Sequence, residues 1–219
     1  MTKDEILEKL NSKKSADRKK ATREISKNII VEFGDELYKK YIEEIKDKKA
    51  WETQCEMIDA LGIIQYKQAF EMIDKIVKEN IVHDTITIRA ATAYVRLKRK
   101  SLNDGSPVLV LLEFGRISVI VGALKALAYD KMIPDNETIE KIINFCWDLK
   151  NHKDIVNGIS DGRNYLAIAC ANWKIKMTEK ILNHYIETAY KFNNVTKDEN
   201  LINICNNSLK GKYSKAYLL

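Results

Sequence analysis

The chain has 219 residues, of which 45% are hydrophobic and 31% are charged, and this composition excludes an intrinsically disordered protein. Its 37 Lys and Arg residues against 31 Asp and Glu residues give a net charge of +6, well below the charge density of a dedicated nucleic-acid-binding arm. With only 8 Gly and 2 Pro, the sequence favours helices joined by short turns.

The N-terminal segment and the cysteines indicate where the protein is found. The segment MTKDEILEKLN mixes charges and has no apolar stretch typical of a signal peptide, and the run VLVLLEF from Val108 is too short to span a bilayer. Cys55, Cys146, Cys170 and Cys205 lie far apart, each among apolar residues at helix-like spacing, so we expect buried free thiols. These features predict a cytoplasmic protein with no membrane partner.

Five segments along the chain share one pattern, in which a polar or turn residue leads into a helix with small or apolar residues four apart. The segments begin at Ser15, Ala50, Asp84, Arg116 and Asp161. Each closes on an apolar anchor, and the equivalent anchors are Ile25, Leu61, Val95, Leu127 and Cys170. Three of the four intervals are about 34 residues and the last is about 43, which predicts a helical repeat array. An insertion at an inter-helix turn over residues 151–164 accounts for the longer interval, and a loop that makes a functional contact is the alternative.

A second type of amphipathic helix is predicted between these segments. In DELYKKYIEEIKD, residues 35–47, the spacing places Leu37, Tyr41, Ile42 and Ile45 on one face. Similar patterns begin at Tyr66, Pro134 and Thr178, the second of them with Asp135 or Asn136 as helix N-cap. The chain therefore consists of predicted helix pairs.

The stretch HDTITIRAATAYVRLKRK, residues 83–100, allows two interpretations. Its first half alternates like a half-buried strand, and its second half has the spacing of a basic amphipathic helix. A single alternating run with no partner strand nearby cannot hold a sheet edge. A helix capped by Asp84 or Thr85, with Ile88, Ala91 and Val95 as its buried stripe, fits the repeat, so we predict a helix.

The segments IDALGII from Ile58, HDTITIRAATAYVRL from His83 and VGALKALA from Val121 resemble the second helix of HEAT repeats. This resemblance implies an all-α fold, an α-α superhelix of about five helix pairs. We expect a single α-solenoid domain over residues 1–219. Its expected repeats cover residues 13–34, 35–65, 66–100, 104–130 and 135–175, followed by a C-terminal capping helix pair over 176–219.

The sequence contains no pattern typical of catalysis or of cofactor binding. His83, His152 and His184 lie in separate turns or helices, and none has a second His or Cys at metal-ligand spacing. Phosphate-binding glycine loops, zinc-protease motifs and nucleophile elbows are all missing from the sequence. We therefore expect no enzyme activity, no cofactor and no metal site.

The helices that carry the anchors predict a binding surface of mixed charge. Just before the first two anchors stand Lys20 and Arg23, then Glu56 and Asp59, so the predicted ridge alternates in sign. Mixed charges suit a protein partner, because opposite charges set register and reject wrong partners. The leading hypothesis is a non-enzymatic scaffold, such as an adaptor, inhibitor or immunity-type protein. The expected partner-binding residues are Lys20, Arg23, Glu56, Asp59, Arg89 and Arg96.

The alternative hypothesis is a nucleic-acid-binding protein. Cations gather in KKSADRKKATR from Lys13 and in RLKRK from Arg96, and such clusters can contact phosphates. Some HEAT-like proteins are DNA glycosylases that grip a duplex with a basic cleft, tryptophans and an aspartate. Here Glu56 and Asp59 interrupt the ridge, and we expect the tryptophans, Trp51, Trp147 and Trp173, to pack in the core.

Overall fold

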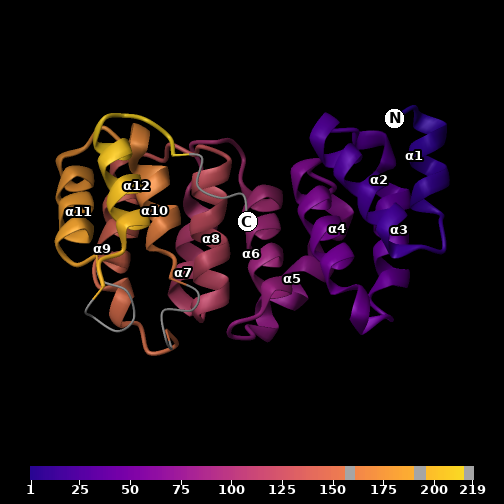
Figure 1. Ribbon diagram of the computed structural model, residues 1–219, viewed down its shortest axis with the longest axis horizontal. Coiled ribbons are helices and arrows are strands. Elements are labelled where there is room, and N and C mark those ends of the chain that lie inside the picture. The colour runs from indigo at the N-terminus through magenta and orange to yellow at the C-terminus, as the bar shows by residue number, and fades with distance from the viewer. Residues whose placement is uncertain (156–160, 190–195, 215–219) are drawn as a thin grey trace. The chain divides into compact units, whose positions relative to one another are not determined.

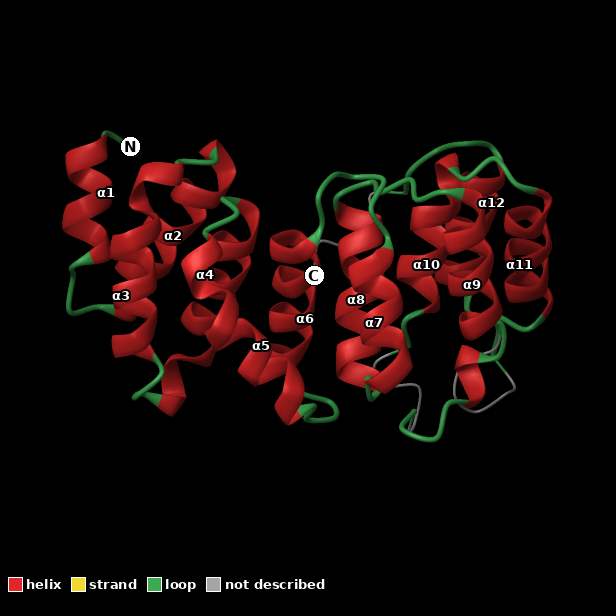
Figure 2. Ribbon diagram, turned by 180° about the vertical axis from the view of Figure 1, so that it is seen from behind, coloured by secondary structure: helices red, strands yellow, loops and turns green. Residues whose placement is uncertain are grey.

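The computed structural model describes residues 1–155, 161–189 and 196–214 (Figure 1). Within these ranges every regular element is a helix and no strand is formed (Figure 2). The predicted all-α fold class is therefore confirmed. The stretch after His83 is helical as predicted, since α6 spans Thr85–Lys98 and the Asp84 carboxylate accepts the backbone N–H of Thr87 at 2.7 Å.

Contacts between residues divide the chain into two compact units, each described by itself. The N-terminal unit comprises residues 1–80 and 84–98, and the C-terminal unit comprises residues 81–83 and 99–219. The N-terminal unit contains α1 (Lys3–Leu10), α2 (Ser15–Asn28), α3 (Gly34–Glu44), α4 (Trp51–Ile63), α5 (Phe70–Glu79) and α6. The C-terminal unit contains α7 (Ser106–Phe114), α8 (Ile117–Tyr129), α9 (Asn136–Cys146), α10 (Arg163–Ala169), α11 (Lys176–Glu187) and α12 (Glu199–Leu209).

Helices pack on their neighbours in chain order, as in a helical repeat fold. In the N-terminal unit, α2, α4 and α6 lie side by side, and α1, α3 and α5 each pack on the helix that follows (Figure 1). In the C-terminal unit, α8, α10 and α12 form one layer while α7, α9 and α11 form the other. Helix α1 was not predicted. The predicted C-terminal pair corresponds to α11 and α12, with residues 190–195 and 215–219 of that range outside the described part.

The repeat anchors form the core of each unit. All five predicted anchors are buried, as are all four cysteine thiols. Burial raises the pKa of the Cys205 thiol to about 12, which keeps it protonated near neutral pH. Helices α4 and α6 approach closely at Gly62, where a Cβ would stand only 2.9 Å from Cα of Ala93. Glycine at this position therefore sets the spacing between these two helices.

Non-glycine residues in the left-handed conformation end several helices. Ile29 ends α2 with a φ of 51° and Asn80 ends α5 with a φ of 53°. Gln65 and Lys131 adopt positive φ values just beyond α4 and α8. Glycine is the usual residue in this conformation. Here other residues take this conformation, which explains how a chain with so few glycines still makes tight turns.

Three apolar residues expected in the core are instead exposed. Ile42 and Ile45 were placed on the buried face with Leu37 and Tyr41, but their exposed fractions are 38% and 43%. Trp51 was expected to pack in the core and is 47% exposed. Leu37 and Tyr41 are buried, so the apolar stripe of α3 is wider than the face that its neighbours cover.

The other two tryptophans lie in the C-terminal unit, where only one is in the core. Trp173 is buried, and its indole N–H donates to the carbonyl oxygen of Met132 at 2.9 Å. Trp147 is half-buried and stacks on His184 with ring centroids 4.9 Å apart. The prediction of core packing is therefore confirmed for Trp173 alone.

A buried aspartate holds the start of α8 in the C-terminal unit. Asp154 lies just before the undescribed residues 156–160, and its carboxylate accepts from the Arg116 guanidinium at 3.0 Å and from the Ile117 backbone N–H at 3.3 Å. The carboxylate thus caps a helix that begins far earlier in the chain. The hydrogen bonds to Arg116 hold the pKa of Asp154 below its usual value.

The lowered pKa of Asp154 predicts a pH dependence of stability. A carboxyl group whose pKa falls on folding stabilises the fold above its unfolded pKa, about 3.9, and this contribution is lost as the pH falls through the folded pKa. We expect Asp154→Asn to lower the free energy of unfolding at pH 7, and the difference from the parent to shrink below about pH 4. Urea titrations at several pH values measure this. Asp148→Asn, at an exposed carboxylate nearby, is the control. A difference that persists unchanged at low pH would contradict the assignment.

Candidate interaction surface

Three acidic residues form a stripe along α4. Glu52, Glu56 and Asp59 follow one another at helical spacings of four and three residues, which places them on one face of the helix. Their side chains are progressively less exposed, at 58%, 27% and 14%. The stripe therefore runs from solvent towards the interior of the N-terminal unit.

Helix α2 supplies cations along one side of this stripe. Lys19 pairs with Glu52, and Arg23 pairs with Glu56 through Nη2 at 2.6 Å and Nε at 3.0 Å. Lys19 and Arg23 are four residues apart on α2, matching the spacing of their acids. The hydrogen bond to Glu56 raises the pKa of Arg23, and the hydrogen bond from Lys19 lowers the pKa of Glu52.

Helix α6 supplies cations along the other side. Arg89 pairs with Asp59, and Arg96 lies with Nη1 4.0 Å from the other Asp59 carboxylate oxygen, Oδ1. That oxygen is buried and accepts no hydrogen bond, so the nearby arginine stabilises it by charge alone. Burial lowers the pKa of Arg89, but several nearby groups, with the charge of Asp59 first among them, together outweigh it and the net pKa is raised. We name the set Lys19, Arg23, Glu52, Glu56, Asp59, Arg89 and Arg96 the charge ladder.

The structure brings together five of the six residues predicted for partner binding. Only Lys20 lies outside the charge ladder, where its neighbour Lys19 takes part instead. Glu52 was also missed by the sequence reasoning. The signal that could have found both is the four-residue spacing, since Lys19 stands four residues before Arg23 and Glu52 four before Glu56.

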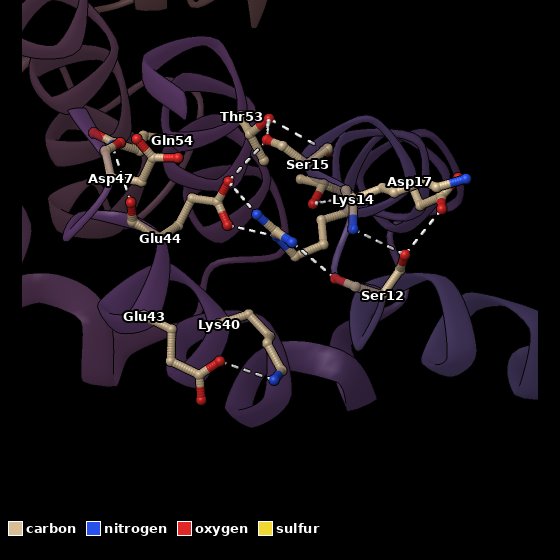
Figure 3. A network of polar contacts seen from close by, with 12 residues as sticks. Ser12, Lys14, Ser15, Asp17, Lys40, Glu43, Glu44, Asp47, Thr53 and Gln54 are labelled. Atoms are coloured by element: carbon tan, nitrogen blue, oxygen red, sulfur yellow. Dashed lines mark hydrogen bonds and ion pairs between the residues drawn. The ribbon is translucent and has the colours of Figure 1, made fainter. Parts of the chain in front are cut away.

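A buried carboxylate connects α2, α3 and α4 beside the ladder (Figure 3). Glu44, at the end of α3, is 4% exposed and accepts from Arg18 of α2 at 2.5 Å through Nε and 2.9 Å through Nη2. Its Oε1 also accepts from the Ser15 hydroxyl at 2.9 Å, and that hydroxyl lies 2.7 Å from the Thr53 hydroxyl of α4. The buried charge is thus paired and hydrogen-bonded, as burial requires.

Three further hydrogen bonds extend this network into the adjoining turns. The Arg18 guanidinium donates through Nη1 to the carbonyl oxygen of Ser12 at 2.7 Å, in the turn between α1 and α2. The Gln54 amide donates to the carbonyl oxygens of Glu44 at 3.1 Å and Asp47 at 2.9 Å, in the turn between α3 and α4 (Figure 3). The two turns are therefore held at the same end of the N-terminal unit.

Most cations of the second basic cluster, RLKRK, contact other residues of the protein. In the N-terminal unit, Arg96 belongs to the charge ladder and Lys98 Nζ lies 4.2 Å from the ring centroid of Phe70. In the C-terminal unit, Arg99 pairs with Asp130 at 2.5 Å. Lys98 and Lys100 of this cluster are exposed and form no ion pair among the described residues.

The described residues contain few groups suited to chemistry. They include no group of three or more His, Cys, Asp or Glu side chains that could hold a metal ion. The thiols are buried, which raises the pKa of Cys146 and Cys170 above the ordinary cysteine value.

No helix in the described ranges is long and apolar enough to cross a membrane. A hollow of about 620 Å³ in the C-terminal unit is lined by both apolar and polar residues, among them Trp173, Leu182 and Glu179.

Comparison with known proteins adds no further guide to function. No model of a protein family matches the sequence, and no curated protein matches it either. The charge ladder and the network around Glu44 are therefore the features on which a functional argument depends.

The buried position of Glu44 predicts a large effect of its removal. Glu44→Ala leaves the half-buried Arg18 without its acid, and we expect a loss of about 3 kcal/mol in the free energy of unfolding. Glu43→Ala is the matched control, because this neighbouring acid is 53% exposed and pairs with Lys40 three residues earlier. It should cost less than about 1 kcal/mol. Equal losses for the two variants in urea titrations would show that the Glu44 network does not stabilise the fold.

Proposed function

We propose that this protein is a non-enzymatic scaffold that holds a partner protein on the face formed by α2, α4 and α6. The single observation that carries the proposal is the charge ladder, which presents alternating charge on three helices packed side by side. Such a surface is already ordered before binding, so the partner meets fixed charges and little conformational entropy is lost.

Parts of the ladder remain accessible to a partner. The side chains of Arg23 and Glu52 are 59% and 58% exposed, while Asp59 and Arg96 lie deeper and fix the helices in place. Exposed charges at the rim of an interface govern association rate and specificity more than affinity. We therefore assign Arg23, Glu52 and Glu56 to partner selection, and Asp59, Arg89 and Arg96 to positioning the helices.

The pairing within the ladder weighs against nucleic acid as the partner. Of the cations in the N-terminal cluster, Arg18, Lys19 and Arg23 each already pair with an acid. A phosphate backbone would have to compete with these carboxylates and would meet Glu52 and Glu56 on the same face. Protein partners that carry charges of both signs meet no such conflict.

A charge swap tests the proposal without removing the ion pair. The double variant Arg23→Glu with Glu56→Arg retains an opposite pair between α2 and α4, so we expect its free energy of unfolding to stay within about 1 kcal/mol of the parent. The charge pattern presented to a partner is reversed, so a stoichiometric protein recovered from native cell extract by the parent should be lost. Quantitative mass spectrometry of both eluates measures this.

The matched control swaps an exposed pair on α9 of the C-terminal unit, Glu137→Lys with Lys141→Glu. This control should recover the partner as the parent does. Recovery of the same protein by parent and Arg23/Glu56 swap alike would contradict the assignment of this face. Recovery of bulk nucleic acid in place of a protein would favour the alternative function.

A further inference from the structure

Three of the exposed apolar residues of the N-terminal unit lie at one end of the α3–α4 pair. Ile42 and Ile45 are one helical turn apart at the end of α3, and Trp51 is the first residue of α4. Their exposed fractions are 38%, 43% and 47%. Exposed tryptophan and isoleucine side chains on the two sides of one turn are typical of an interaction site and not of an ordinary surface.

Five exposed lysines surround this end of the unit. Lys46, Lys48 and Lys49 lie in the turn between α3 and α4, and Lys13 and Lys14 lie in the turn between α1 and α2. The hydrogen bond from Arg18 to the Ser12 carbonyl and the contact between the Ser15 and Thr53 hydroxyls hold the two turns together (Figure 3). We name these five lysines, with Ile42, Ile45 and Trp51, the lysine edge.

The acids around the lysine edge are occupied by other groups. Glu44 pairs with Arg18, Glu52 with Lys19 and Glu43 with Lys40. The Asp47 carboxylate accepts the backbone N–H of Lys49 at 2.9 Å. Within the described ranges none of the five lysine ammonium groups forms an ion pair, so the edge has a net positive charge.

We propose that the lysine edge binds an acidic segment of a partner protein, with an aromatic or large aliphatic residue of that segment packed on Trp51 and the two isoleucines. This inference rests on the proposed scaffold function and names a second contact surface and its chemistry. The lysines attract the segment and set its association rate, and the apolar residues supply the anchor that slows its release.

Two features favour a protein segment over the other anionic partners. Of the three apolar residues only Trp51 offers a ring on which a base could stack, and the two isoleucines suit aliphatic side chains instead. The cations are all lysines, which act as point charges and do not provide the bidentate phosphate recognition typical of arginine.

A random peptide library displayed on phage and selected on the full-length protein tests this inference. We expect the enriched peptides to be acidic and to contain at least one aromatic or large aliphatic residue. The affinity of a labelled selected peptide, measured by fluorescence anisotropy, should fall at least about tenfold with Trp51→Ala. Replacing all five lysines of the edge by Gln should weaken binding and flatten its dependence on salt.

Two variants of the C-terminal unit are the matched controls. Phe145→Ala removes an aromatic residue that is 41% exposed, and replacing Lys174, Lys176, Lys180, Lys210 and Lys212 by Gln removes five exposed lysines. Both should bind the peptide as the parent does. Circular dichroism of every variant confirms that the fold is retained.

Other outcomes overturn the inference in distinguishable ways. A selection that yields basic or uncharged peptides, no peptides, or acidic peptides unaffected by Trp51→Ala contradicts the lysine edge. Peptides lost with the Arg23/Glu56 swap but not with Trp51→Ala leave the proposed function standing and overturn this inference alone. If only single-stranded DNA or phosphatidylserine vesicles bind, and binding depends on the five lysines, both proposals fall.

Discussion

Every acid of the stripe on α4 pairs with a cation from a neighbouring helix. This pairing determines the charge pattern on the surface of the N-terminal unit. Helix α4 has α2 on one side and α6 on the other, and it shares its acids between them. A single exposed ion pair contributes little to stability, but a connected set partly shielded from water contributes more because its members hold one another in place. The ladder therefore fixes the register of three helices at their rim, while Ile25, Leu61 and Val95 fix it in the core.

The same pairing determines which charges are left for partners. Arg18 is bound by the buried Glu44, and Lys19 and Arg23 are bound by the stripe. Exposed cations without an ion pair among the described residues remain in the turns, at the lysine edge, and on the helices, as at Lys20. A sequence with modest net charge thus presents one face of alternating sign and one edge of positive sign. The two surfaces suit a protein partner that carries charges of both signs and an acidic segment.

Much of the fold follows from the sequence because the repeat imposes consistency on each helix. The residues before Ile88 alternate as in a strand but form a helix, because Asp84 caps this helix and the anchor spacing requires it. Helix α1 was missed, although Thr2 and Glu5 form a capping box whose pattern is visible in the sequence. Its moderate length and charged composition gave no repeat signal.

The surface was harder to predict, for two physical reasons. Ile42 and Ile45 fit the periodicity of a buried face, but how much of a helix is covered depends on the distance to its neighbours and not on its own sequence. The sequence predicts Lys20, five residues before its anchor, whereas Lys19 forms the ion pair, because a rotation of one residue cannot be fixed without the partner helix. The Arg18–Glu44 pair joins residues far apart in the chain, and only packing reveals such a pair.

The acids of α4 pair with the cations of α2 and α6 and so keep them from binding phosphates. Binding of duplex DNA tests this directly. The triple variant Glu52→Gln, Glu56→Gln and Asp59→Asn frees the cations of α2 and α6 while keeping side-chain size. Fluorescence anisotropy at a series of salt concentrations gives the slope of log affinity against log salt for parent and variant. The account predicts weak binding by the parent and a slope steeper by up to about three phosphate equivalents for the variant. Submicromolar binding by the parent, with a steep slope that the variant does not change, would contradict it.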